Sequence, residues 1–126
     1  MKALNMSAIA ETEPLFESDQ LELLRAALGE ADLSAMLLQL PQAAVDSLRA
    51  IQAALDAGNL DETRKAAHVL KGFSSSLGAA RLASVAREIE LDLDTLSSIA
   101  DHMPLLSATI EATISDLSRY APVAQN

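Results

Sequence analysis

Apolar residues recur at intervals of three or four positions along most of the chain, which is the spacing of one face of an α-helix. A short first helix is predicted between Ser18, which suits an N-cap, and Gly29, which suits a helix stop. The pattern resumes over residues 32–57 and keeps nearly the same phase on both sides of Pro41. We therefore predict one long helix over residues 32–57, kinked at this proline.

Three more apolar stripes follow along the chain. They predict a helix over about 60–77, another from about residue 79 to between 94 and 98, and a last helix near the C-terminus. Pro104 suits the first turn of a helix, which favours a start for the last helix at 101–103. A start near Thr95 would instead require a kink at this proline.

Each of the four main helices has one apolar face, and an antiparallel four-helix bundle buries all four faces at once. We therefore predict an all-α fold, with the short first helix as an addition at the N-terminus. The composition agrees, because half of the residues are apolar, only 2% are aromatic, and Leu and Ala dominate. We assign residues 18–121 to the helical domain, 1–17 to a flexible N-terminal tail and 122–126 to a C-terminal tail.

The net charge and the absence of cysteine exclude several classes of protein. A net charge of −9 argues against nucleic acid and against anionic membrane surfaces as partners. Without cysteine there is no disulfide, no thiolate catalysis and no cysteine metal site. No apolar run approaches the length that spans a bilayer, and the N-terminus lacks the apolar stretch of a secretory signal. The simplest expectation is a soluble cytoplasmic protein.

Positive charge is concentrated around one histidine. Residues 64–87 hold five of the nine Lys and Arg and no Asp or Glu. A helical wheel places His68 opposite Leu70, away from the predicted core. The polar face on which it lies also holds Asp61, Arg64, Lys71, Gly72 and Ser75. A solvated helix face would explain the charges alone, but together with an exposed histidine they suggest a negatively charged partner or group.

Several kinds of catalytic site are missing from the sequence. The two histidines, His68 and His102, lie on different predicted elements, and no residues show the spacing of a metal site. There is no G-x-S-x-G nucleophile elbow and no glycine-rich loop that could bind ATP. We expect no metal and no cofactor, and we interpret His102 as a polar residue at a helix start.

His68 itself could act as a nucleophile toward phosphorus. An exposed imidazole has a large neutral fraction near pH 7, and its ring nitrogen can hold a phosphoryl group as a phosphoramidate. Phosphoryl transfer also needs positive charge around the phosphoryl oxygens, which Lys71 can supply from one turn along the helix. Arg64 and Lys65, one turn before, can add to it. Gly72 leaves open space beside the ring, although a mid-helix glycine costs about 1 kcal/mol relative to alanine.

Residues 67–82, AHVLKGFSSSLGAARL, resemble the motif A-H-x-L-K-G-x-S-x-x-L-G-A-x-x-L of the histidine-containing phosphotransfer (HPt) domain. The resemblance implies that His68 is phosphorylated on Nε2, that Lys71 assists electrostatically and that Gly72 provides room. It implies that the chain carries phosphoryl groups between receiver domains of response regulators or of a hybrid histidine kinase. The Mg²⁺ for transfer would belong to the receiver, and the chain would be a monomer without kinase activity or a cofactor of its own.

Some positions depart from the pattern of the family. Phe73 stands where a small polar residue is common, and the wheel places it toward the core. Glu90 lies on the neighbouring predicted helix, where it could accept the Nδ1 proton of the histidine or be a surface charge. Asp94, one turn later, is acidic where some members have a basic residue. Besides Glu90, the candidates for supporting roles are Arg64, Lys65 and Ser75.

Two alternative functions stay open from the sequence. The first is the dimerisation and phosphoacceptor domain of a histidine kinase, in which an acidic residue and then a proline typically follow the histidine. Here Val69 follows it, and no proline occurs until Pro104. The second is a purely structural helical interaction module in which His68 has no special role.

Overall fold

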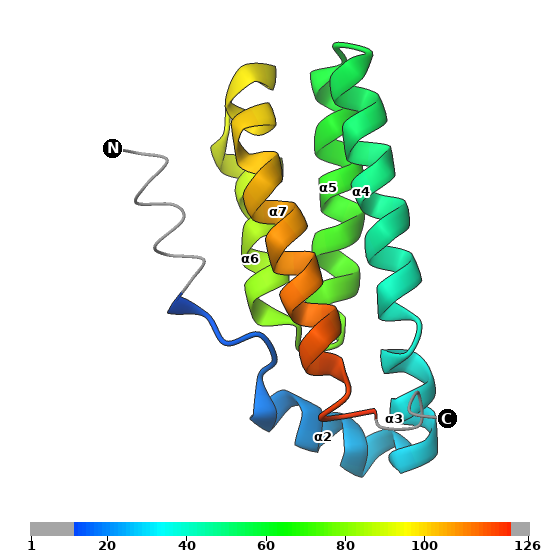
Figure 1. Ribbon diagram of the computed structural model, residues 1–126. Coiled ribbons are helices and arrows are strands. Elements are labelled where there is room, and N and C mark those ends of the chain that lie inside the picture. Colours follow the sequence, from blue (N-terminus) through cyan, green and yellow to red (C-terminus); the bar gives the residue numbers. More distant parts are fainter. Residues whose placement is uncertain (1–11, 122–126) are drawn as a thin grey trace.

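The computed structural model describes residues 12–121, and all regular structure in this range is helical (Figure 1). In chain order the elements are α2 (Ser18–Leu28), α3 (Glu30–Leu37), α4 (Leu40–Asp56), α5 (Leu60–Ser76), α6 (Ala80–Arg87), the π-helix η1 (Glu88–Asp92) and α7 (Leu96–Leu117). The predicted all-α class is confirmed. Residues 1–11 and 122–126 lie outside the described residues, and with them the C-terminal tail and most of the predicted N-terminal tail. Within residues 12–121, no helix is long and apolar enough to cross a membrane.

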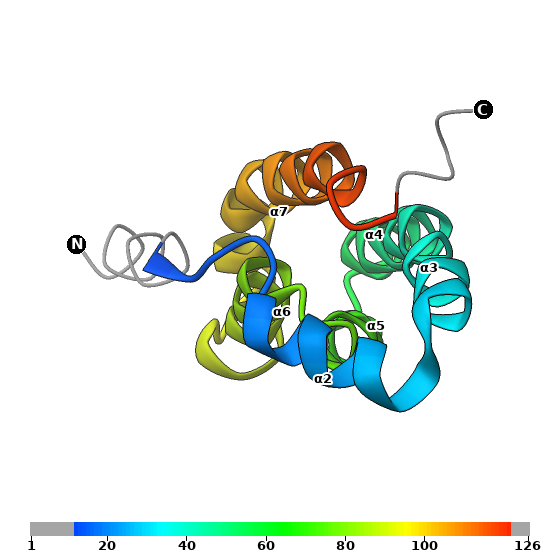
Figure 2. The same ribbon diagram turned by 90° about the horizontal axis from the view of Figure 1, so that it is seen from below.

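The helices α4, α5, α6 and α7 form an antiparallel bundle. Each contacts the next along the chain, and α7 contacts α4, so that the four enclose a common centre. Figure 2 shows this arrangement along the bundle, with α2 crossing in front of α5 and α6, at the end of the bundle that is lowest in Figure 1. Short connections join successive helices, and this forces neighbours to run in opposite directions. The predicted four-helix bundle with a short additional N-terminal helix is therefore confirmed.

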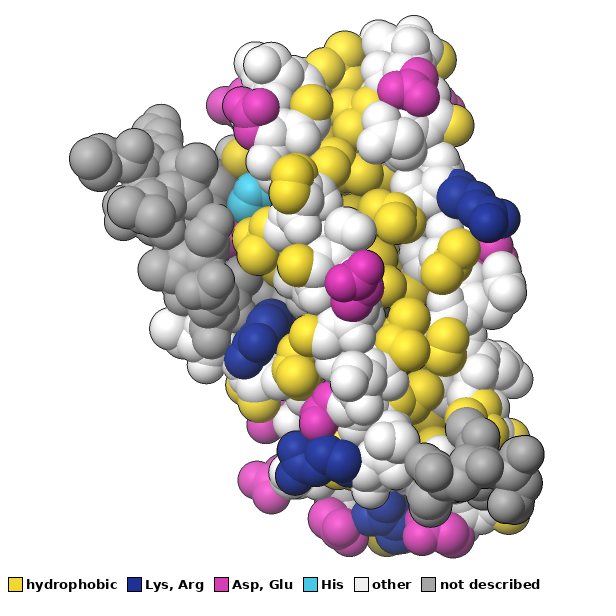
Figure 3. All heavy atoms as spheres, viewed as in Figure 1, with side chains coloured by type: hydrophobic (Ala, Val, Ile, Leu, Met, Phe, Trp, Pro, Cys, Tyr) yellow, Lys and Arg dark blue, Asp and Glu magenta, His cyan; other side chains and the backbone are white. Residues whose placement is uncertain are grey.

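The core consists of aliphatic side chains from all four bundle helices. Ile51 of α4, Leu70 of α5, Leu82 of α6 and Leu106 of α7 are each completely inaccessible to solvent. Burying one such side chain contributes about 1.5–3 kcal/mol to the stability of the fold. Hydrophobic side chains also line the seam between α4 and α7 at the surface (Figure 3). The bundle is thus held together mainly by leucine, isoleucine and alanine packing.

The single kinked helix predicted for residues 32–57 is wrong, because the structure contains two helices there. Helix α3 ends at Leu37 and α4 begins at Leu40. Pro41 has no N–H to donate to the carbonyl group of Leu37, so the helical hydrogen-bond pattern is interrupted. The intervening residues stay close to helical, with φ −70° and ψ −11° at Leu38, which explains why the apolar pattern keeps its phase.

The preferred start of the last helix at 101–103 is also wrong, because α7 begins at Leu96. Thr95 and Ser98 form a capping box in which each side chain accepts a hydrogen bond from the other's backbone N–H, at 3.0 and 3.3 Å. This cap satisfies free N–H groups at the helix start. Pro104 consequently lies inside the helix rather than in its first turn.

The helix predicted from about residue 79 is α6, and it continues as the π-helix η1, which we did not predict. It ends at Asp92, before the predicted end between 94 and 98, because the backbone is already extended at Leu93. The N–H of Leu93 donates to the carbonyl oxygen of Glu88 over 3.0 Å, five residues back instead of four. Such π turns are rare and often occur at functional sites.

Residues 13–17, which we assigned to a flexible tail, are held against the bundle. The N–H of Glu17 donates to Gly78 over 2.8 Å, and the N–H of Arg81 donates to Pro14 over 2.9 Å. Phe16 is buried, with its ring 5.2 Å from that of Tyr120. The N-terminal segment is therefore part of the packed structure from residue 13 onward.

Two leucines of α2 test how firmly this helix is docked. Leu21 is only 1% exposed, so Leu21→Ala is expected to lower the free energy of unfolding by about 2–5 kcal/mol. Leu23 is 72% exposed, and Leu23→Ala is expected to change it by less than about 0.5 kcal/mol. Urea unfolding followed by circular dichroism measures both. Equal effects of the two substitutions would show that α2 is not packed on the bundle as described.

Candidate functional site

Helix α5 holds the candidate histidine at the surface of the bundle. Its N-cap is Asn59, whose side chain accepts a hydrogen bond from the N–H of Glu62 over 3.0 Å. Ala67 and Leu70 are completely buried on the inner face of the helix, which fixes its rotation. The side chain of His68 is consequently 62% exposed. The prediction that it points away from the core is confirmed.

Glu90 lies between His68 and Lys71 and contacts both. Its Oε2 is 2.7 Å from Nδ1 of His68, and its Oε1 is 2.7 Å from Nζ of Lys71. The carboxylate is only 16% exposed and Lys71 only 25%, whereas the imidazole is largely open to solvent. Two interpretations of Glu90 were open from the sequence. The structure supports the one in which Glu90 accepts a hydrogen bond from Nδ1 of His68, and not the one in which it is only a surface charge.

This contact sets which ring nitrogen of His68 carries the proton. The ion pair with Lys71 lowers the pKa of Glu90, and the hydrogen bond with His68 lowers it further, although partial burial opposes both. An ionised carboxylate can only accept a hydrogen bond, so Nδ1 must be the donor. In the neutral ring, Nε2 then keeps its lone pair and is the nitrogen able to react.

Arg64 and Lys65 border the histidine but are engaged elsewhere. Arg64 lies 3.9 Å from the carboxylate of Asp94, and Lys65 lies 3.5 Å from those of Asp61 and Glu62. Both basic residues line an open hollow of about 530 Å³ that also includes the imidazole. Of the basic residues we predicted, Lys71 is the one joined to the histidine, through Glu90.

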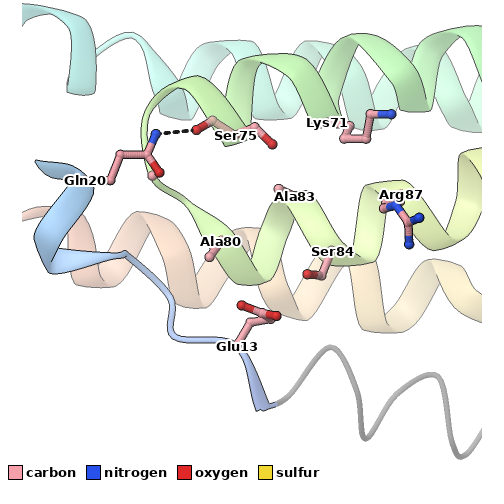
Figure 4. A pocket seen from close by; sticks show the side chains of 9 residues that line it. Glu13, Gln20, Lys71, Ser75, Ala80, Ala83, Ser84 and Arg87 are labelled. Carbon is pink, nitrogen blue, oxygen red and sulfur yellow. Dashed lines mark hydrogen bonds between the residues drawn. The ribbon is translucent and has the colours of Figure 1, made fainter. Parts of the chain in front are cut away.

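A second cavity, of about 310 Å³, lies between α5 and α6 (Figure 4). Lys71 and Ser75 line it from α5, and Ser84 and Arg87 line it from α6. The carbonyl oxygen of Ser75 accepts a hydrogen bond from Gln20 over 2.7 Å, but none of the described contacts joins its hydroxyl group to the histidine. Ser75 thus lies near the site without touching its reactive group.

Arg87 was part of the basic stretch in the sequence, but we gave it no role in the site. Its side chain is exposed, and among the described residues it has neither an ion pair nor a hydrogen bond. It shares the second cavity with Lys71. Glu13 lines the same cavity, so its carboxylate partly offsets the positive charge that Lys71 and Arg87 bring to this side of the site.

The space beside Gly72 is open, as predicted. A Cβ atom built at this position would meet nothing within 4 Å. Gly72 borders an apolar hollow of about 380 Å³ with Met36, Val69 and Phe73. Val69 is 64% exposed, while Phe73 is partly buried against the core, as the wheel indicated.

His102 differs from our interpretation of it as a polar residue at a helix start. It lies inside α7, where it is only 5% exposed and its Nε2 is 2.6 Å from Oε1 of Glu88. Neither sequence spacing nor composition linked these two residues. In the part of the chain that the structure describes, no cluster of three or more His, Cys, Asp or Glu could hold a metal ion.

Comparison with known proteins identifies the class to which this bundle belongs. Residues 35–120 match the family model of the Hpt domain, so the chain belongs to the Hpt domain family. It is a helical-bundle protein that takes part in histidine phosphotransfer in phosphorelays. Among solved structures it is similar to histidine-containing phosphotransfer protein B (HptB) from Pseudomonas aeruginosa PAO1, at 26% identity and a TM-score of 0.60, covering 87% of this chain and 90% of that one. A comparison with curated proteins gave no match.

Titration of Glu90 tests the geometry of the site. We expect its carboxyl group, followed by NMR, to titrate below the ordinary glutamate value of about 4.3, because Lys71 and His68 stabilise the ionised form. Lys71→Met removes the largest of these contributions and should raise the midpoint.

The sign of the effect on stability follows from the same shift. A lowered pKa in the folded state stabilises the protein at pH values above the unfolded-state pKa, and this stabilisation is lost as the pH falls through the folded-state pKa. The difference in unfolding free energy between wild type and Lys71→Met should therefore shrink on acidification below about pH 4. A Glu90 midpoint that Lys71→Met leaves unchanged would contradict the ion pair.

Proposed function

We propose that His68 is the phosphoacceptor and that it exchanges phosphoryl groups with aspartates of receiver domains in a multistep two-component phosphorelay. The observation that carries this proposal is the hydrogen bond between Nδ1 of His68 and Glu90, which leaves Nε2 as the free nucleophile. Family membership supports the reaction class, and the exposure of the imidazole supports access by a second protein.

The transfer step is a displacement at phosphorus. The lone pair of Nε2 attacks the phosphorus atom of an aspartyl phosphate, a P–N bond forms, and the P–O bond to the aspartate breaks. The aspartate leaves as a carboxylate, and the proton stays on Nδ1, so the phosphorylated ring becomes positively charged. Glu90 offsets this charge through its hydrogen bond to Nδ1. Transfer to the next receiver is the same step in reverse.

Lys71 supplies positive charge near the reacting group. Its ammonium group is already held in place by Glu90 at 2.7 Å, so little conformational freedom is lost when it also faces phosphoryl oxygens. Phosphoryl transfer depends mainly on such positioning and charge stabilisation. The described residues contain no metal-binding cluster, and we propose that the Mg²⁺ required is held by the receiver.

The receiver would dock on the apolar surface around His68. Val69 is 64% exposed and Leu91 is 51% exposed, and both line the same hollow as the imidazole. Exposed aliphatic side chains beside a reactive group are typical of a protein-binding surface. We propose that the protein acts in the cytoplasm as a monomeric carrier without kinase activity. Membership of the Hpt domain family favours this function over a histidine kinase's dimerisation domain and over a purely structural module.

Phosphate transfer from a labelled receiver tests the proposal directly. With a phosphorylated receiver domain and Mg²⁺, the wild-type chain is expected to acquire label that is acid-labile and alkali-stable. His68→Gln should acquire none, because glutamine offers no nucleophilic nitrogen. Lys71→Ala should slow transfer by about 10-fold to 100-fold, since one stabilising charge is lost.

The matched control is Arg49→Ala, which removes a positive charge from an exposed position on α4 that has no ion pair among the described residues. It should transfer at the wild-type rate. Label that survives His68→Gln would refute the assignment of the phosphoacceptor. Undiminished transfer in Lys71→Ala would refute only the assisting role of the lysine.

Substitution of Gly72 should affect stability and function in opposite directions. A side chain fits here without a clash, and a non-glycine residue favours the helix, so Gly72→Gln should stabilise the fold by about 0.5–1 kcal/mol. The same side chain would occupy the space beside His68 and slow transfer. Thermal unfolding and the transfer assay measure the two effects. A more stable variant with full transfer activity would show that the open space is not needed.

A further inference from the structure

A buried pair of titratable residues lies behind the site and takes no part in the proposed step. Nε2 of His102 is 2.6 Å from Oε1 of Glu88, and their side chains are only 5% and 6% exposed. Burial raises the pKa of Glu88, and the hydrogen bond with His102 opposes this. Removing such groups from water is unfavourable unless they are paired. A bundle built almost wholly from aliphatic side chains does not need this pair in order to pack.

Glu88, one member of this pair, is located on the same π turn as Glu90. Glu88 begins η1, and Glu90 follows two residues later, about half a helical turn around the axis. The two carboxylates therefore project to different sides of the turn. Glu88 contacts His102 on α7, and Glu90 contacts His68 on α5. Any rotation of η1 about its own axis would displace both contacts together.

The far end of the π turn is also anchored. The N–H of Leu93 closes the turn by donating to Glu88 over 3.0 Å, and the carbonyl oxygen of Leu93 accepts a hydrogen bond from Arg64 of α5 over 3.2 Å. The turn is thus tied to α7 at its beginning and to α5 at its end. Because π turns are rarely stable on their own, these external contacts help η1 to keep one geometry.

We propose that Glu88 and His102 are positioning residues for phosphoryl transfer: their buried hydrogen bond fixes the rotation of η1, so that Glu90 holds Nδ1 of His68 and leaves Nε2 reactive. The role in transfer rests on the proposed function of His68. The effect on the imidazole does not, because the tautomer of His68 is a property of the unphosphorylated protein.

An apolar double variant separates positioning from stability. In Glu88→Met/His102→Leu both polar groups are replaced together, so no unpaired buried group remains and the fold should keep most of its stability. Glu88→Gln is the conservative variant, because its amide oxygen can still accept a hydrogen bond from Nε2 of His102. Asp101→Asn is the surface control, since Asp101 is exposed and adjacent to His102 in sequence.

The first measurement is ¹⁵N NMR of the His68 ring, which reports which nitrogen carries the proton. Wild type, Glu88→Gln and Asp101→Asn should show mainly the Nδ1–H form. The folded double variant should show a mixture of the two tautomers, because Glu90 no longer holds Nδ1. The second measurement is the rate of label transfer from a phosphorylated receiver. It should fall by about 10-fold to 100-fold in the double variant and stay near wild type in the other two.

The outcomes distinguish the two proposals. An unchanged tautomer and rate in the folded double variant, or a Glu88→Gln variant that behaves like the double variant, would overturn the positioning role. If the double variant does not fold, a second apolar pair, Glu88→Leu/His102→Phe, carries the same test, because it also leaves no unpaired buried polar group. If wild type accepts no label from receivers, the proposed function fails, while the ring NMR still decides whether the pair positions Glu90.

Discussion

The site depends on one carboxylate that is shared between two basic groups. Glu90 uses one oxygen for the imidazole of His68 and the other for the ammonium group of Lys71. Because the carboxylate is mostly shielded from solvent, these contacts are stronger than they would be on an open surface. Without Glu90, the histidine would be an exposed ring free to rotate and to exchange tautomers. With it, the ring presents one nitrogen outward, and a cation lies beside it.

The bundle provides this arrangement through the regular spacing of α5. His68, Lys71 and Gly72 lie on one side of the helix because residues three and four positions apart share a face. Ala67 and Leu70 are buried against the core, and this keeps the face that carries His68 turned toward solvent. The aliphatic core therefore does not take part in the chemistry. It determines the direction in which the reactive nitrogen points, and packed side chains allow that direction little variation.

Relations between residues close together in the sequence were predicted correctly, whereas contacts between residues far apart in the sequence were not. The relation between His68, Lys71 and Gly72 is local to one helix, so a helical wheel was sufficient. The role of Glu90 stayed open, because its contact with the histidine is created by the packing of α6 and η1 against α5. The π turn and the Glu88–His102 pair were missed for the same reason, since neither has a local signal. Two of the helix boundaries that were wrong involved a proline, where local preference was outweighed by a capping box or by a missing donor.

The exposed face around His68 also sets how the protein can work with more than one partner. The imidazole, Val69 and Leu91 all border a single hollow. Under the proposed function, a phosphate donor and a phosphate acceptor would need the same surface and could not bind together. Every cycle would then include the departure of one partner before the arrival of the next. The rate of relay would be limited by dissociation, so tight binding to either partner would slow the flow of phosphate through the chain.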